Sequence, residues 1–258
     1  MTSLLNISFE YVFGLWTATP VFSLIVSNLL LIGIIFVALT LIEDNFNRFP
    51  KRFLDEAILA AGSVLLVQFN KPICTAWGYL GVFATCCYCK KVVARLTPAN
   101  ASGSAAAPIK EWLGSRLSFE RLTAILFAQT FATILALEFD ATFTASGNTC
   151  AFNPQQPFLC MAVFEVLASC MLMALNDSPS RLKDEVVLTM HGLLGVARVY
   201  FIGIGGINIS VYVRNLLLCP NANTKMTSFA VIPVITAIGS FFVERWSVPE
   251  DRNAVLPR

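Results

Sequence analysis

Long apolar runs recur along the chain, and they restrict its fold more than any other feature. An α-helix that crosses the hydrocarbon layer needs about 20 apolar residues, with a range of roughly 17 to 25. Runs of this kind occur at residues 21–42, 53–69, 73–89, 119–138, 157–175, 186–207 and 226–243. The pattern predicts an all-α fold, a polytopic integral membrane helix bundle with about seven transmembrane helices in one domain over residues 1–258.

Composition agrees with a membrane protein rather than a soluble one. Hydrophobic residues make up 56% of the chain and charged residues only 13%, whereas an ordinary soluble domain has about 25% charged residues. The net charge of +2 comes from basic residues that are scattered among short loops, so no nucleic-acid surface is expected. The expected partners are the lipid bilayer and other membrane-protein subunits.

The basic residues are divided unevenly between the two sides of the predicted bundle. With seven spans, fourteen of the 18 Lys and Arg fall on one side and three on the other. Basic loops stay on the inner side of a membrane, so the N-terminus is expected outside and the C-terminus inside. The loop at 96–116 is rich in Ala, Ser and Gly and is expected to be a flexible connector. As an alternative, its "IKEWLGSRL" end forms a short amphipathic helix on the membrane surface.

The amino-terminal segment carries no Lys or Arg ahead of the first apolar run. A secretory signal peptide and a mitochondrial presequence both need basic residues there, so neither is expected and Met1 is expected to stay on the chain. The sequence therefore indicates an integral membrane protein. It leaves the organelle open between the mitochondrial inner membrane and an endomembrane.

The sixth predicted span carries charged residues. Asp184, His191 and Arg198 are seven residues apart, so they share one helix face, with Gly195 on nearly the same line. A charge near the bilayer centre costs about 2.5 to 3.5 kcal/mol, so Arg198 needs a counter-ion. Glu165 lies at a similar depth in the fifth span, and we expect the two residues to meet in an antiparallel helix pair.

This charged group has two interpretations. In the first, Glu165, Arg198 and His191 form a proton or ion relay in a polar cavity. In the second, Glu165 and Arg198 are a buried ion pair that fixes helix register, and His191 is hydrogen-bonded at an interface. One charge pair among seven helices is sparse for a transport pathway, which favours the second interpretation.

Small and polar residues in the predicted spans indicate helix packing. Asn28, Gln68 and Gln129 are expected to hydrogen-bond between helices, which contributes about 0.6 to 2 kcal/mol each. A glycine cluster in the sixth span would also permit that helix to break. The glycines expected to allow close helix contact are Gly195, Gly203, Gly205 and Gly206.

The chain has eight cysteines. Cys150 is expected to form a disulfide with Cys160 or Cys74 if the outer side is oxidising, and the sequence does not choose between them. The "CCYC" motif at 86–89 has no second group of ligands at zinc spacing, so no metal site is expected. Apolar packing or acylation at the membrane edge is the favoured interpretation of that motif.

Motifs of the common enzyme classes do not occur in the sequence. There is no G-x-S-x-G, H-E-x-x-H, Walker loop or dinucleotide fingerprint, and a single histidine excludes multi-histidine haem or di-iron chemistry. No cofactor is expected. The sequence favours a non-catalytic multi-pass membrane protein, an accessory or structural subunit of a larger membrane complex, with energy-transducing complexes included. The alternatives are a small ion channel or transporter that uses Glu165, Arg198 and His191 and, more weakly, a lipid-modifying enzyme.

Overall fold

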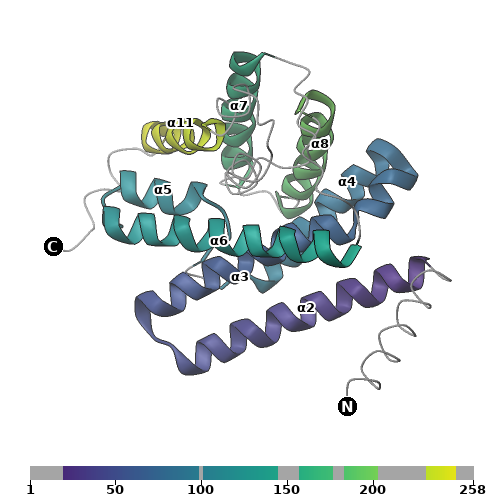
Figure 1. The fold of residues 1–258 in the computed structure, drawn as a ribbon. Helices are drawn as coiled ribbons and strands as arrows, with labels where there is room; N and C mark the ends of the chain where they lie inside the picture. Colours follow the sequence, from purple (N-terminus) through teal and green to yellow (C-terminus); the bar gives the residue numbers. More distant parts are fainter. Residues whose placement is uncertain (1–19, 99–100, 145–156, 177–182, 203–230, 248–258) are drawn as a thin grey trace.

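The computed structural model describes residues 20–98, 101–144, 157–176, 183–202 and 231–247. All regular structure in these ranges is helical, so the described part of the chain has the all-α fold that the sequence predicts (Figure 1). The helices are α2 (Pro20–Asn45), α3 (Arg48–Phe69), α4 (Lys71–Leu96), α5 (Ala106–Leu113), α6 (Phe119–Thr144), α7 (Phe158–Asn176), α8 (Lys183–Ile202) and α11 (Ile232–Ser247).

Three helices of the described residues are long and apolar enough to cross a membrane, and the prediction of seven spans is wrong. The candidate spans are Leu24–Asn45 in α2, Lys71–Leu96 in α4 and Phe119–Phe139 in α6. Charged residues occur in α3 and α8, and the described residues of α7 and α11 contain the shorter apolar helices Phe158–Leu172 and Val234–Val243. Among the described residues, the apolar runs of the sequence are helices, and three of them meet the length and composition of a membrane crossing.

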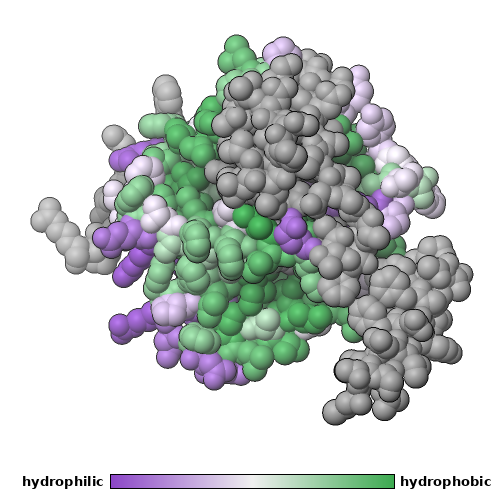
Figure 2. All heavy atoms as spheres, in the orientation of Figure 1, coloured by the Kyte–Doolittle hydropathy of each residue, from purple (hydrophilic) through white to green (hydrophobic). Residues whose placement is uncertain are grey.

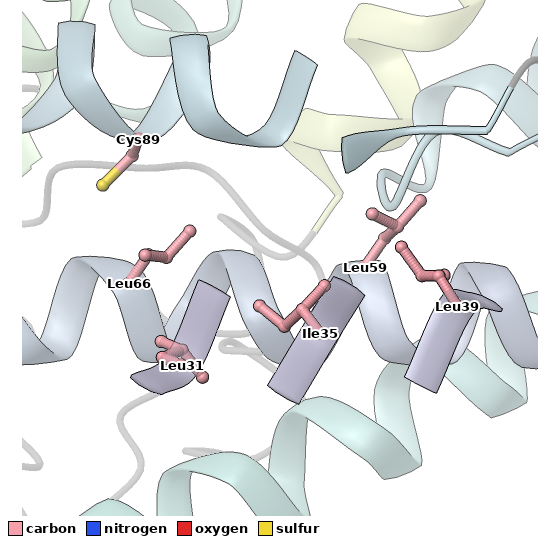
Figure 3. Packing of buried hydrophobic residues seen from close by; sticks show 6 residues of the cluster. All are labelled: Leu31, Ile35, Leu39, Leu59, Leu66 and Cys89. Atoms are coloured by element: carbon pink, nitrogen blue, oxygen red, sulfur yellow. The ribbon is translucent and has the colours of Figure 1, made fainter. Parts of the chain in front are cut away.

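The more polar helix α3 lies among the three candidate spans. It packs against α2, α4 and α6, and only Phe46 and Asn47 separate it from α2, so α2 and α3 form an antiparallel hairpin (Figure 1). A Cβ atom on Gly62 of α3 would lie 2.5 Å from Cδ1 of Ile35, which means that glycine permits the close approach of these helices. Figure 3 shows the resulting core of α2, α3 and α4, built from Leu31, Ile35, Leu39, Leu59, Leu66 and Cys89.

Helix α4 contains a sharp bend. Gly78 has φ +54° and ψ −133°, a conformation that favours glycine. A Cβ atom on Gly81 would collide with the carbonyl oxygen of Ile73, and Cys74 Sγ lies 3.5 Å from Thr85 Oγ1. The start of α4 therefore folds back on the rest of the helix, which leaves about 27 Å of straight helix over residues 79–96 at 1.5 Å per residue.

The later helices do not continue the direction of the first ones. In Figure 1, α7 and α8 stand steeply across α2, α3 and α6. Helix α11 packs against α7 and α5, and α5 packs against α6. Helix α5 lies within the 96–116 segment, and it buries Pro108 and Ile109. The core below it consists of Ala105, Ile109, Leu117, Leu122, Ile125 and Ala237.

Charged side chains collect at the end of the molecule where α2 ends and α3, α5 and α6 lie close together (Figure 2). Salt bridges and a cation–π contact connect these elements. They are Lys51 Nζ to Glu43 Oε1 at 3.2 Å, Arg52 to both carboxylate oxygens of Glu111 at 2.8 and 2.9 Å, and the Arg121 guanidinium 5.5 Å from the Phe49 ring centroid. Lys51 and Arg52 of α3 and Arg121 of α6 therefore lie at one end, and green apolar surface adjoins this end (Figure 2).

Candidate functional site

Glu165 of α7 and Arg198 of α8 form a bidentate ion pair. Arg198 Nε and Nη2 donate hydrogen bonds of 2.7 Å each to Glu165 Oε1 and Oε2. The Phe164 and Phe201 rings meet edge to face with their centroids 5.9 Å apart, as in an antiparallel pair of helices. The Glu165 side chain is 2% exposed and that of Arg198 is 19% exposed. The pairing of two planar groups uses both carboxylate oxygens and neutralises both charges.

His191 and Asp184 lie on α8 at a distance from this pair. Asp184 lies seven residues before His191, and His191 lies seven residues before Arg198. Seven residues correspond to about 10 Å along a helix. His191 is half-buried and Asp184 is exposed in the first turn. Burial lowers the pKa of His191 to about 4, and the neighbouring Lys90 and Arg198 act in the same direction. The imidazole is therefore neutral at pH 7, and the structure brings together only Glu165 and Arg198 of the predicted group.

A glycine that the sequence analysis missed permits the contact between α4 and α8. A Cβ atom on Gly192 would lie 2.6 Å from Cys87 Sγ and 2.7 Å from the Phe83 ring. Cys87 Sγ also donates a hydrogen bond to the Leu188 carbonyl oxygen at 3.4 Å. Of the predicted packing glycines, Gly195 is buried in α8. The others, Gly203, Gly205 and Gly206, lie outside the described residues.

The cysteines serve different parts of the fold. Cys74 and Cys160 are free thiols, and Cys150, the third residue of the predicted disulfide, lies outside the described residues. Within the "CCYC" motif, Cys87 faces α8 and Cys89 is buried in the core of α2, α3 and α4. In the described part of the chain, no group of His, Cys, Asp and Glu side chains is arranged to hold a metal ion.

A second polar site lies in α3, and the sequence analysis missed it. Glu56 is fully buried. Its carboxylate accepts hydrogen bonds from the backbone N–H groups of Ser102 at 3.2 Å and Gly103 at 2.8 Å, and from Gln129 Nε2 at 2.7 Å. Gly103 has φ +65° and packs on Leu59, where a Cβ atom would come within 2.8 Å of Leu59 Cβ. Burial raises the pKa of Glu56, and these hydrogen bonds oppose the rise.

Asp55, the neighbour of Glu56, is also fully buried. In the part of the chain that the structure describes, neither of its carboxylate oxygens has a hydrogen-bond partner. Burial raises the pKa of Asp55, Lys51 lowers it and Glu43 raises it again. The sequence does contain a signal for this site, because two adjacent acids lie near the start of the apolar run that begins at Phe53. The mean hydropathy of the whole run conceals them.

Two surface pockets border α4, and neither includes the Glu165–Arg198 pair. One has a volume of about 410 Å³ and is lined by Lys90, Val93, Ala94, Thr97, Pro98, Ala101 and Ser102. The other has a volume of about 340 Å³ and is lined by Lys71, Cys74, Thr75, Gly78, Tyr79, Val82 and Val199. The ion pair is therefore not part of either pocket wall.

No protein-family model matches the chain, and no curated protein matches its sequence. Function is therefore inferred from the geometry alone.

Proposed function

We propose that the chain is a non-catalytic, multi-pass membrane protein that serves as an accessory, structural subunit of a larger membrane complex. The observation that carries this proposal is an apolar stripe on α7. Four residues spaced four apart line one side of that helix with their side chains exposed. They are Leu159 at 71%, Val163 at 51%, Leu167 at 64% and Met171 at 40% exposure.

The opposite side of α7 is already occupied within the chain. Met161 and Ala168 are buried there together with Glu165, which holds Arg198 of α8. Val166 of α7 packs against Gly239 of α11. A Cβ atom on Gly239 would lie 3.0 Å from Cγ1 of Val166. The exposed stripe is thus a separate surface of α7.

A stripe of this kind needs a cover, because large exposed apolar patches mark interaction surfaces. The described residues of α7 contain only the shorter apolar helix Phe158–Leu172, which favours a protein partner over lipid as the cover of the stripe. We therefore assign the stripe to an apolar helix of a partner subunit, which would pack through van der Waals contacts.

The Glu165–Arg198 pair supports a structural role. Both carboxylate oxygens are held by the guanidinium, and a buried pair of this kind can fix the register of two helices. His191 is neutral and about 10 Å along the helix from Arg198. The Glu165–Arg198 contact is fixed and charge-balanced, as expected of an ion pair that holds two helices together.

The alternative is a small ion channel or transporter that uses Glu165, Arg198 and His191. It is supported by the burial of an acid and a base beside Cys86 of a candidate span. Replacing Glu165 with Gln in protein reconstituted into vesicles should abolish proton or cation flux if this alternative holds. Flux that is absent in the wild type, or unchanged in the variant, excludes it.

The structural proposal is tested by weakening the stripe. The full chain carrying Leu159→Ala and Leu167→Ala should lose partner subunits that copurify with the wild type in stoichiometric amounts in mild detergent. The matched control carries Leu30→Ala and Ile34→Ala on α2, where the side chains are equally exposed at 60% and 65% but belong to a candidate span. Equal loss in both variants, or no stoichiometric partner with the wild type, contradicts the proposal.

A further inference from the structure

We propose that Asp55 is a buried proton-binding site, occupied at neutral pH, so that this residue is a neutral carboxylic acid in the folded protein. The inference is independent of the proposed partner subunit, because it concerns the interior of α2, α3, α4 and α6. The Asp55 carboxylate takes one proton from water and becomes a neutral carboxyl group.

The first observation is the isolation of the Asp55 side chain. It is 0% exposed, and both carboxylate oxygens lack a hydrogen-bond partner within the described residues. An unpaired ionised carboxylate in an apolar interior is so unfavourable that such groups normally become neutral instead. Burial of this kind raises the pKa of an acid, and it is the largest influence on Asp55.

The nearby charges oppose each other, because Lys51 lowers the pKa of Asp55 and Glu43 raises it, while burial is the larger influence. On α3 itself, Lys51 pairs with Glu43 of α2 and Arg52 pairs with Glu111 of α5. The residue that follows Asp55 on α3 is a second acid, Glu56. Among the described residues of α4 and α6, no charged group acts on Asp55.

Glu56 provides a comparison within the same turn of helix. It is as deeply buried as Asp55, but it accepts hydrogen bonds from Gly103 N, Ser102 N and Gln129 Nε2. Donors of this kind stabilise an ionised carboxylate. The described residues therefore supply hydrogen-bond donors to the carboxylate of Glu56 and not to that of Asp55.

Other polar side chains in this bundle satisfy themselves by donating to the backbone carbonyl four residues earlier. Asn28 does so to Leu24 at 2.8 Å, Asn70 to Leu66 at 2.7 Å and Thr40 to Phe36 at 2.9 Å. A carboxylate has no donor, whereas a protonated carboxyl group has one O–H. With its proton, Asp55 can donate to the carbonyl oxygen of Lys51 in the same way.

The proton has a consequence for stability. Between the ordinary value of 3.8 and the raised pKa of Asp55, the folded state holds a proton that the unfolded state releases. The free energy of unfolding therefore falls as pH rises through this interval, and the fall ends once the folded-state pKa is passed. An Asn at this position keeps the donor and cannot ionise.

The experiment compares the full-length wild type with Asp55→Asn in detergent. The unfolding temperature of the variant should be higher at about pH 8 and should depend less on pH between about 5 and 8. In infrared spectra at neutral pH, the variant should lose one carbonyl band of a protonated carboxylic acid. The control Asp44→Asn alters an exposed acid and should keep both the band and the pH dependence.

Three results would overturn the proposal. One is a wild-type spectrum without any protonated carboxyl band at neutral pH, which needs no variant. Another is an Asp55→Asn protein with a lower unfolding temperature than the wild type at about pH 8 or with an unchanged band. The last is a rise in the wild-type unfolding temperature with Na⁺ or K⁺ that Asp55→Asn lacks, because a bound cation would then occupy the site.

Discussion

Glu165 and Arg198 neutralise each other only while both side chains are present. Glu165→Gln removes the charge of the carboxylate that binds Arg198 through two hydrogen bonds, and removal of one partner of a buried pair typically costs about 3 to 5 kcal/mol of stability. The double variant Glu165→Leu with Arg198→Met removes both charges, and it should recover most of that loss. Unfolding in detergent micelles measures both effects.

Glu185→Gln is the control for these variants, because it changes an exposed acid of α8 and should change stability by about 0.5 kcal/mol or less. A Glu165→Gln protein that is as stable as this control would show that the ion pair does not hold α7 to α8.

Glu56 is predicted to hold the 101–104 segment against α3. Glu56→Ala leaves the N–H groups of Ser102 and Gly103 and the amide of Gln129 without their acceptor, and each unsatisfied buried group costs about 1 to 3 kcal/mol. Hydrogen exchange should become faster at Ser102 and Gly103. Glu120→Ala, at an exposed position, should leave that exchange unchanged, and equal exchange in both variants would contradict the role of Glu56.

At the residue scale, the sequence predicted contacts that follow from charge and failed for those that depend on three-dimensional neighbours. An arginine in an apolar segment demands an acid at similar depth, so Glu165 could be paired with Arg198 in advance. The Glu56 site joins α3 to a segment about 46 residues away in sequence and to Gln129 of α6. No local sequence pattern predicts a contact between residues so far apart in the chain.

At the scale of elements, close packing of α4 and α8 depends on Gly192. Gly192→Val would press on Cys87 Sγ and Phe83, and overpacking of this kind costs about 1 to 3 kcal/mol. Gly33→Val is the matched control, because nothing lies within 4 Å of the site of its Cβ atom. Alkylation of Cys87, followed by peptide mass spectrometry, should become faster only in the Gly192 variant. Equal rates would contradict the close contact.

The apolar runs predicted where the helices lie, but not which of the helices face lipid. The runs predicted at 21–42 and 119–138 correspond to α2 and α6, which are candidate spans. The run at 53–69 corresponds to α3, whose buried Asp55 and Glu56 make it a helix enclosed by others rather than one that faces lipid. Hydropathy averages a helix over all its faces, so it cannot distinguish contact with lipid from contact with other helices.

The sequence did not indicate where the chain changes direction in α4, because that depends on the backbone conformation of single residues. Pro72, between the predicted runs 53–69 and 73–89, lies in the first turn of α4, where a proline costs no hydrogen bond. The change of direction lies at Gly78. The positive φ of Gly78 accompanies the packing of Cys74 beside Thr85, a contact that the sequence does not display.

At the scale of the whole molecule, the basic end is predicted to lie on the inner side of the membrane. An impermeant maleimide should label the exposed Cys160 of α7 in intact, right-side-out vesicles. In a variant without the other cysteines, Arg116→Cys should react only after the vesicles are permeabilised. Labelling of Arg116→Cys in sealed vesicles would reverse this orientation.

Three of the described helices are long and apolar enough to cross a membrane, and polar side chains are enclosed between helices at two places. Helix α3 keeps two acids among α2, α4 and α6, and α7 with α8 encloses an ion pair. The stripe of Leu159, Val163, Leu167 and Met171 is the surface that this account assigns to another subunit. Native mass spectrometry of the full chain, released from its own membrane in mild detergent, tests that assignment most directly. The account predicts a complex of fixed stoichiometry with other membrane subunits, and a monomer that carries only lipid and detergent would contradict it.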